Sequence, residues 1–248
     1  MIREAVVLAG GFGSRLRSIV KDVPKPMALI QEKPFLEYLL IYLINQGIKK
    51  VILSVGYKHD IIQNYFGSKF QDIDLQYVIE DTPLGTGGAI KKAAEKTESS
   101  NYFVFNGDTF FQVNLEKLFY QHQQSKADIT LALKQLNNFS RYGVVKTNKN
   151  GRVTSFSEKR KHVKGNINGG VFLINTKVFD QFVFPQKFSM EEDVIQKKVK
   201  NLMIYSYLTN AYFIDIGVPE DYRKAQQELP NYLIQESSQS ENNESSYL

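Results

Sequence analysis

A run of apolar residues near the start of the chain leads directly into a cluster of glycines. The run is Val6–Ala9, and the glycines are Gly10, Gly11 and Gly13. Glycine has no Cβ, so its backbone can turn sharply and lie close to a bound molecule. The N–H groups of such a loop, and of a helix that starts behind it, form a site for anions. Arg15 and Lys25 add positive charge nearby, and together these features predict a ligand that carries phosphate.

Two common phosphate-binding loops do not fit this cluster. A P-loop requires Gly-Lys followed by Ser or Thr, and no such run occurs. A dinucleotide-binding loop requires Gly-x-Gly-x-x-Gly, but Leu16 stands where the third glycine should be. What remains is Gly-Gly-x-Gly-x-Arg-Leu, with Lys25-Pro26-Met27 downstream. The glycines alone would favour an ordinary strand-to-helix turn, whereas the two cations favour a phosphate site.

The composition excludes several classes of protein. The chain of 248 residues has a net charge of +5, spread over the sequence, so no nucleic-acid partner is expected. The absence of cysteine excludes disulfides, thiolate nucleophiles and cysteine metal sites. Neither a signal peptide nor an apolar run of membrane-spanning length is evident. We therefore expect a cytoplasmic protein with small-molecule partners and no membrane partner, and association into a homo-oligomer stays open.

Strand and helix patterns alternate through the first half of the chain. This rhythm predicts a parallel sheet with helices on both faces, and ligands of such sheets bind at the carboxyl ends of the strands. The predicted strands are Ala5–Ala9, Val51–Gly56, Leu75–Ile79 and Tyr102–Asn106. The predicted helices are Lys33–Gln46, His59–Phe66, Thr86–Thr97 and Leu115–Ser125.

The second half of the chain is richer in short strands. Asn150-Gly151 predicts a hairpin, and Ser189 suits the cap of a helix with Glu191 and Glu192 in its first turn. The predicted strands are Ile129–Lys134, Gly143–Thr147, Val153–Ser157, Gly169–Ile174, Met203–Tyr207 and Tyr212–Ile216. The predicted helices are Ser189–Lys200 and one that starts near Pro219. We expect one domain over residues 1–228 and a polar, largely disordered tail over residues 229–248.

Two aspartates are candidate metal ligands. Asp108 follows an apolar strand and Gly107, where its carboxylate can hold Mg²⁺ against phosphates; a simple turn cap is the alternative. Asp215 lies within an apolar strand, where a carboxylate must be paired, hydrogen-bonded or metal-bound unless it faces solvent. The three histidines, His59, His122 and His162, have polar neighbours in the sequence and are expected at the surface.

Further candidates are spread along the chain. A second glycine cluster at a helix start allows close approach of a base or ribose, or is a flexible loop; its candidates are Gly85, Thr86 and Gly88, with Glu80 and Asp81 as weaker ones. A lysine can neutralise a phosphate, and a glutamate or an asparagine amide can bind hydroxyl groups. The residues that offer this chemistry are Gly143, Glu158, Lys159 and Asn168, for which surface charges and turn residues are the alternatives.

In their order along residues 2–228, these motifs resemble those of the sugar-1-phosphate nucleotidyltransferases. The resemblance implies a Rossmann-like α/β fold, with a mixed, mainly parallel sheet flanked by helices and a small β-rich region on the sugar side. Two departures are visible. The chain has Arg17-Ser18-Ile19 where the family often has Pro-Leu-Thr, and Glu158-Lys159-Arg160 where it has Glu-Lys-Pro. The second departure leaves the sugar-phosphate contact open among Lys159, Arg160 and Lys161.

The resemblance also implies a reaction. The phosphate oxygen of a sugar 1-phosphate attacks the α-phosphorus of a nucleoside triphosphate, and pyrophosphate leaves. The implied catalytic residues are Arg15, Lys25 and Asp108, and the implied Mg²⁺ ligands are Asp108 and Asp215. The implied nucleotide-binding residues are Leu8, Gly10, Gly11, Gly13, Gly85, Thr86 and Gly88. The implied sugar-phosphate contacts are Gly143, Glu158, Lys159 and Asn168.

Within the family, the chain is most similar to the branch that uses GTP and a heptose 1-phosphate for surface polysaccharides. The stretches that carry this similarity are Leu29–Tyr57, Pro83–Ala89, Asn106–Phe111, Asn166–Phe172 and Tyr212–Tyr222. One alternative is mannose or glucose 1-phosphate with another nucleotide. The other is a regulatory homologue that binds nucleotide sugars without catalysis, which we would expect to have lost the acids or the signature cations.

Overall fold

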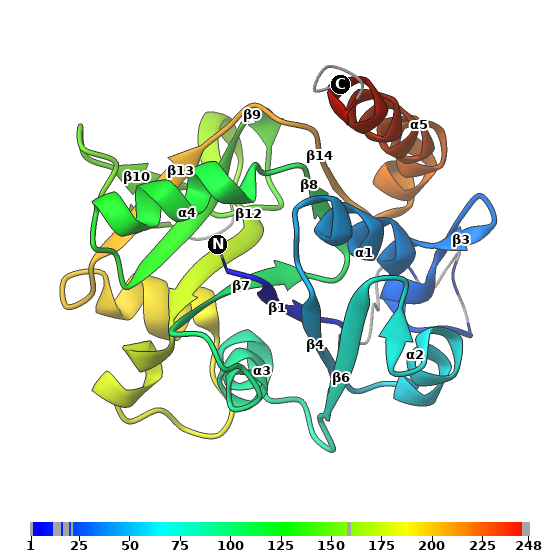
Figure 1. Ribbon diagram of the computed structural model, residues 1–248. Helices are drawn as coiled ribbons and strands as arrows, with labels where there is room; N and C mark the ends of the chain where they lie inside the picture. Colours follow the sequence, from blue (N-terminus) through cyan, green and yellow to red (C-terminus); the bar gives the residue numbers. More distant parts are fainter. Residues whose placement is uncertain (1, 12–15, 17–19, 21, 158–159, 245–248) are drawn as a thin grey trace.

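An eight-stranded sheet forms the centre of the molecule (Figure 1). The computed structural model describes residues 2–11, 16, 20, 22–157 and 160–244, and side chains as far as residue 231. The strand order is β13-β9-β12-β7-β1-β4-β6-β5. These strands are β1 (Glu4–Leu8), β4 (Lys50–Val55), β5 (Lys69–Phe70), β6 (Ile73–Ile79), β7 (Asn101–Asn106), β9 (Ile129–Phe139), β12 (His162–Asn175) and β13 (Ile204–Leu208).

The middle of the sheet is parallel. Strand β1 pairs in parallel with both β4 and β7, and β4 with β6. Strand β12 is antiparallel to both β7 and β9, so β9 and β13 run in the same direction as β7 again. At the other edge, β5 is antiparallel to β6. The predicted mixed, mainly parallel α/β sheet is therefore confirmed.

Helices cover both faces of the sheet (Figure 1). Because side chains alternate along a strand, the neighbours Val6 and Val7 belong to opposite hydrophobic clusters. On the Val7 side lie α1 (Phe35–Asn45), α2 (His59–Phe66), α4 (Leu115–Gln124) and α5 (Pro219–Glu244). On the Val6 side lie α3 (Gly85–Ala94), the 3-10 helix η2 (Thr176–Gln181) and the π-helix η3 (Met190–Gln196).

Three small antiparallel strand pairs surround the main sheet. They are β2 (Leu29–Ile30) with β3 (Lys33–Pro34), β8 (Thr109–Phe111) with β14 (Phe213–Asp215), and β10 (Val145–Thr147) with β11 (Val153–Phe156). The predicted hairpin at Asn150-Gly151 joins the last pair, and Gly151 has a φ of 78°, which favours glycine. The β8–β14 pair sets Thr109 opposite Asp215 and so brings the two halves of the chain together.

Some elements differ from the prediction. The strand predicted over Gly169–Ile174 begins at His162, because its polar first half pairs with β9, which itself continues to Phe139. Ser189 caps its helix as predicted by accepting from the Glu192 N–H, but that helix is a π-helix that ends at Gln196. Helix α5 spans Pro219–Glu244 and so enters the segment predicted to be a tail. The division of the chain at residue 228 stays a prediction.

The expected surface position of His122 is wrong. This residue is buried, with Nδ1 2.8 Å from Thr130 Oγ1 and Nε2 3.1 Å from Asn101 Oδ1. Burial lowers the pKa of His122 to about 4, against a smaller opposite effect of the Asp128 charge. No helix in the described part of the chain is both long and apolar enough to cross a bilayer.

Candidate active site

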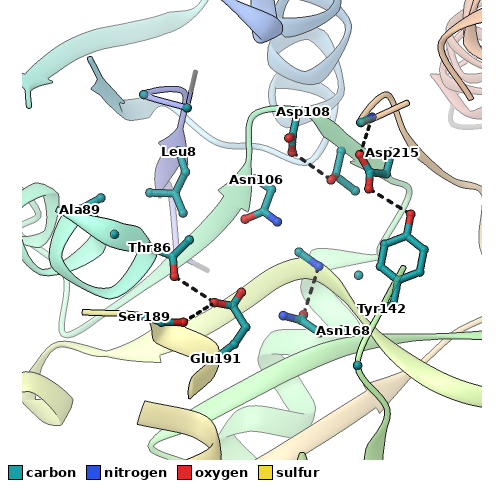
Figure 2. Close-up of a pocket in the computed structure, with 18 of the residues that line it drawn as sticks. Leu8, Thr86, Ala89, Asn106, Asp108, Tyr142, Asn168, Ser189, Glu191 and Asp215 are labelled. Atoms are coloured by element: carbon teal, nitrogen blue, oxygen red, sulfur yellow. Dashed lines mark hydrogen bonds between the residues drawn. The ribbon is translucent and has the colours of Figure 1, made fainter. Parts of the chain in front are cut away.

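A cavity of about 910 Å³ opens at the carboxyl ends of β1 and β7 (Figure 2). It is lined by these predicted residues: Leu8, Gly10, Gly11, Lys25, Gly85, Thr86, Asp108, Gly143, Asn168 and Asp215. Gly88 was predicted for the same site but does not line it. The predicted residues Gly13, Arg15, Glu158 and Lys159 lie outside the described residues.

The ends of β1 and β7 touch at the floor of this cavity. The Gly107 N–H donates to the Leu8 carbonyl over 2.9 Å. A Cβ at position 107 would lie only 2.7 Å from that oxygen, so the chain can pass here only as glycine. This close approach places Asp108 beside the start of the glycine-rich loop that follows β1.

A lysine lies between the two aspartates that were predicted as metal ligands. Lys25 Nζ is 2.5 Å from Asp108 Oδ2 and 3.6 Å from Asp215 Oδ1, and the lysine side chain is only 12% exposed. Lys25 begins the 3-10 turn Lys25–Met27, and the φ angles of Pro24 before the turn and Pro26 within it are restricted. The turn therefore holds the ammonium group against both carboxylates.

Asp215 is held by neighbours on two sides. Its Oδ2 accepts a hydrogen bond of 3.0 Å from the Tyr142 hydroxyl, and its Oδ1 accepts one of 2.7 Å from the Gly217 N–H (Figure 2). Burial, followed by the nearby Asp108 charge, raises the pKa of Asp215, against the opposite effects of Lys25 and these two hydrogen bonds. Burial likewise raises the pKa of Tyr142, which keeps its hydroxyl a donor.

Tyr142 is itself fixed by an ion pair. The Arg141 guanidinium binds the Asp221 carboxylate and lies 5.3 Å from the centre of the Tyr142 ring. Asp221 belongs to the first turn of α5. The helix that packs against α1 thus also supports the orientation of Asp215 through Arg141 and Tyr142.

The two carboxylates suit a hard cation. Mg²⁺ is usually held by one or two carboxylates, with phosphate oxygens and waters as the other ligands. Within the ranges that the structure describes, no group of three or more acidic or histidine side chains could hold a metal ion alone. The donor set therefore fits an ion that arrives with a phosphate-bearing ligand.

The second glycine cluster packs against the segment before η3. Gly85 has a φ of 72°, and a Cβ there would lie 2.5 Å from the Phe188 carbonyl oxygen. The Gly87 N–H donates to the same oxygen over 3.0 Å. A Cβ on Gly88 would lie 2.6 Å from the Gln186 carbonyl oxygen, which explains its position behind the cavity wall. The glycines thus allow the start of α3 to pack closely against Gln186 and Phe188, while Gly85 also lines the cavity.

For several residues that line the cavity, the sequence contains little or no sign of a ligand contact. They are Glu80, Asn106, Arg141, Tyr142, Phe156, Ser189, Glu191, Glu192, Gln196 and Phe213. Glu80 accepts hydrogen bonds from Ser54 Oγ and the Leu84 N–H, and its Oε1 lies 2.7 Å from where a Cβ on Gly10 would be. The acids of the Ser-Met-Glu-Glu-Asp run are typical of a helix start, and only the fold places Glu191 and Glu192 at the cavity.

The sugar-side residues come from the antiparallel part of the fold. Asn168 Oδ1 accepts from the Gly170 N–H over 3.1 Å, which leaves the side-chain amide nitrogen for a ligand (Figure 2). A Cβ on Gly143 would lie 2.3 Å from the Ser157 carbonyl oxygen, so this glycine is also required by packing.

Known proteins of one family are similar to this chain in sequence and in fold. The model of the Nucleotidyl transferase family matches residues 4–231. A D-glycero-alpha-D-manno-heptose 1-phosphate guanylyltransferase of Aneurinibacillus thermoaerophilus is 52% identical over 93% of this chain and 100% of its own length. An enzyme of the same name from Campylobacter jejuni is 48% identical over 88% of this chain and 96% of its own length.

A solved structure extends the similarity to three dimensions. The crystal structure of HddC from Yersinia pseudotuberculosis superposes with a TM-score of 0.83 at 37% identity, covering 92% of this chain and 99% of that one. The same protein complexed with GMP-PN gives a TM-score of 0.82 over the same shares of both chains.

Proposed function

Because this chain belongs to the nucleotidyl transferase family, we propose that it transfers GMP from GTP to D-glycero-α-D-manno-heptose 1-phosphate and releases pyrophosphate. The observation that carries this proposal is the identity of 52% over the whole length of a relative with that name. The complex of HddC with GMP-PN supports a guanine nucleotide as the ligand.

Members of this family generally use a divalent metal ion. We propose Mg²⁺, with Asp108 and Asp215 as its protein ligands, because both carboxylates face the same point of the cavity. When bound, the ion supplies positive charge to the phosphates of the nucleotide. Tyr142 and the Gly217 N–H orient Asp215 for this task.

The chain's own cations serve the phosphates. Lys25 lies within reach of both acids, so its ammonium group is placed to stabilise the charge that grows on the α-phosphate during displacement. In phosphoryl transfer little covalent work falls to the protein, so such positioning accounts for most of the acceleration. Arg15 remains our candidate for the β- and γ-phosphates, and Lys159 for the incoming sugar phosphate.

The two substrates meet in one cavity. We assign the nucleotide to the side of Leu8, Gly10, Gly85 and Thr86, and the sugar phosphate to the side of Gly143 and Asn168. Attack of the sugar-phosphate oxygen then takes place next to Asp108. We further propose that the enzyme works in the cytoplasm and that its product supplies surface-polysaccharide synthesis, as the resemblance implies.

The test is pyrophosphate release with Mg²⁺ from each of GTP, UTP, CTP, ATP and dTTP, each paired with heptose, mannose and glucose 1-phosphate. We expect release with GTP and the heptose phosphate. Release with a different pair replaces the substrates and keeps the reaction. A folded protein that binds nucleotide but releases no pyrophosphate with any pair contradicts the proposal and favours the regulatory alternative.

A further inference from the structure

Glu191 presents one carboxylate oxygen to the cavity while its other oxygen is fixed. Oε2 accepts hydrogen bonds of 2.9 Å from Thr86 Oγ1 and 3.3 Å from Ser189 Oγ (Figure 2). Within the described part of the chain, Oε1 has no hydrogen-bond donor and the carboxylate has no cationic partner. A half-buried carboxylate in this arrangement can still accept hydrogen bonds from a ligand.

The position of Glu191 depends on contacts between distant segments. The Thr86 hydroxyl also accepts from the Met190 N–H over 2.9 Å, and the Phe188 N–H donates to the Leu84 carbonyl over 3.0 Å. With the Thr86–Glu191 contact and the N–H groups of Gly87 and Gly88, which donate to the Phe188 carbonyl, five hydrogen bonds join the start of α3 to the start of η3. Such fixed orientation lowers the entropy cost of binding and makes Glu191 a selective contact.

The neighbours of Glu191 indicate the ligand. In Figure 2 the carboxylate points toward the space between Asn106 and Asn168. A carboxylate that accepts and an amide that donates, facing one space, are complementary to hydroxyl groups, which do both. The phosphates are excluded as partners, because two negative groups would repel each other without a cation.

We propose that Glu191 binds ring hydroxyl groups of the sugar 1-phosphate and so determines which sugar is accepted. The inference rests on the proposed function. It adds a charged hydrogen-bond acceptor for the sugar, which Gly143 and Asn168 do not provide. Thr86 is then a positioning residue for this contact in addition to lining the nucleotide side.

The matched pair of variants is Glu191→Gln and Glu116→Gln. Both glutamates are the second residue after a side-chain cap, Ser189 in η3 and Asn114 in α4, so both variants lose the same favourable charge at a helix start. Glu116 is exposed and does not line the cavity. A difference between the two variants that is confined to the KM of one substrate therefore reports a contact with that substrate, whereas loss of the Thr86 and Ser189 contacts would not single out the sugar.

We expect Glu191→Gln to raise KM for the sugar 1-phosphate by about 10- to 100-fold, the range for hydrogen bonds to a charged group. KM for GTP should stay within a factor of two or so of the Glu116→Gln value by the same reasoning. Sugar phosphates that lack a single hydroxyl group identify the hydroxyl that Glu191 binds. Removal of that hydroxyl should weaken binding to the wild-type enzyme more than binding to Glu191→Gln, because the variant has already lost part of the contact.

Three outcomes decide the matter. A raised KM for the sugar alone supports the proposal. A raised KM for GTP with an unchanged KM for the sugar overturns it and assigns Glu191 to the nucleotide, while the proposed function stands. A wild-type enzyme that releases no pyrophosphate with any sugar phosphate overturns the proposed function, and the inference about Glu191 falls with it.

Discussion

Lys25 Nζ lies 2.5 Å from Asp108 Oδ2, at the place where two carboxylates converge. The lysine and the aspartate are 83 positions apart in the sequence; the lysine is mostly buried and the aspartate is partly exposed. With Asp215 at 3.6 Å, the ammonium group offsets the repulsion between two acids. Under the proposed function, the same ammonium group also contacts the phosphates of the nucleotide, so the ion pair must loosen when the nucleotide binds.

Replacing Lys25 by alanine should reduce kcat by about 10²- to 10³-fold, since one preorganised charge contact to the reacting group has that effect. The same variant should bind a divalent ion in the absence of nucleotide more tightly than wild type, because the acids lose their cationic partner. Calorimetric titration with Mn²⁺ measures the second effect. Lys149→Ala, an exposed lysine in a turn, is the control, and equal turnover of the two variants would contradict the assignment.

The Tyr142→Phe variant should raise the Mg²⁺ concentration needed for half-maximal activity by about 10-fold. Loss of the hydroxyl removes the hydrogen bond to Asp215, and groups that orient metal ligands typically have effects of this size. Titration of pyrophosphate release with Mg²⁺ measures the change. Tyr120→Phe is a matched control, because Tyr120 is 62% exposed on α4. An unchanged Mg²⁺ requirement in Tyr142→Phe would show that Asp215 needs no such support.

His122 should make the fold sensitive to acid. Its pKa is about 4 in the folded state and about 6.5 when unfolded, so between these values the unfolded chain binds more protons. Protonation of His122 therefore leaves the free energy of unfolding unchanged above about pH 6.5. As the pH decreases from 6.5 through 4, the free energy of unfolding decreases, by about 3 kcal/mol in total below both pKa values. Urea denaturation at several pH values measures this. His122→Gln should flatten the dependence, whereas His59→Gln, which retains His122, should not.

Two glycines with positive φ angles provide a test of packing. Gly85 and Gly67 have φ of 72° and 63°, but a Cβ on Gly85 would meet the Phe188 carbonyl at 2.5 Å and one on Gly67 would meet nothing within 4 Å. Gly67→Ala should cost about 1–3 kcal/mol from backbone strain alone, because a φ of 63° with a ψ of −150° is essentially limited to glycine. Gly85→Ala should cost more and also reduce activity, because Phe188 leads into the segment that holds Glu191. Thermal unfolding and turnover together measure both effects, and equal losses would contradict the packing argument.

The parallel sheet was predictable because each strand is marked by its own residues. The apolar run before Gly10 and the apolar run before Asp108 each mark the end of a strand by their local sequence alone. These two strand ends form the floor of the cavity. The helix over His59–Phe66 agrees with its prediction at both ends. The resemblance to sugar-1-phosphate nucleotidyltransferases is confirmed by the family model and by the two guanylyltransferase relatives.

The rest of the site depends on contacts between segments far apart in the sequence. Apart from the family resemblance, nothing near Asp215 in the chain indicates that it lies beside Asp108; the β8–β14 register places it there. Nothing near Glu191 indicates a ligand, since an acid at a helix start has a sufficient local reason. His122 has polar neighbours along α4, yet Thr130 and Asn101 from two strands enclose it.

The β8–β14 pair has a consequence for how the enzyme matures. One acid of the proposed metal site is reached before the midpoint of the chain, and the other only near its end, at Asp215. A growing polypeptide that has completed β7 and β8 therefore has half a site, however well its sheet is formed. Catalytic competence should arrive in a single late step, when β14 docks on β8. Fragments that end before residue 213 should stay inert even where they fold and bind nucleotide.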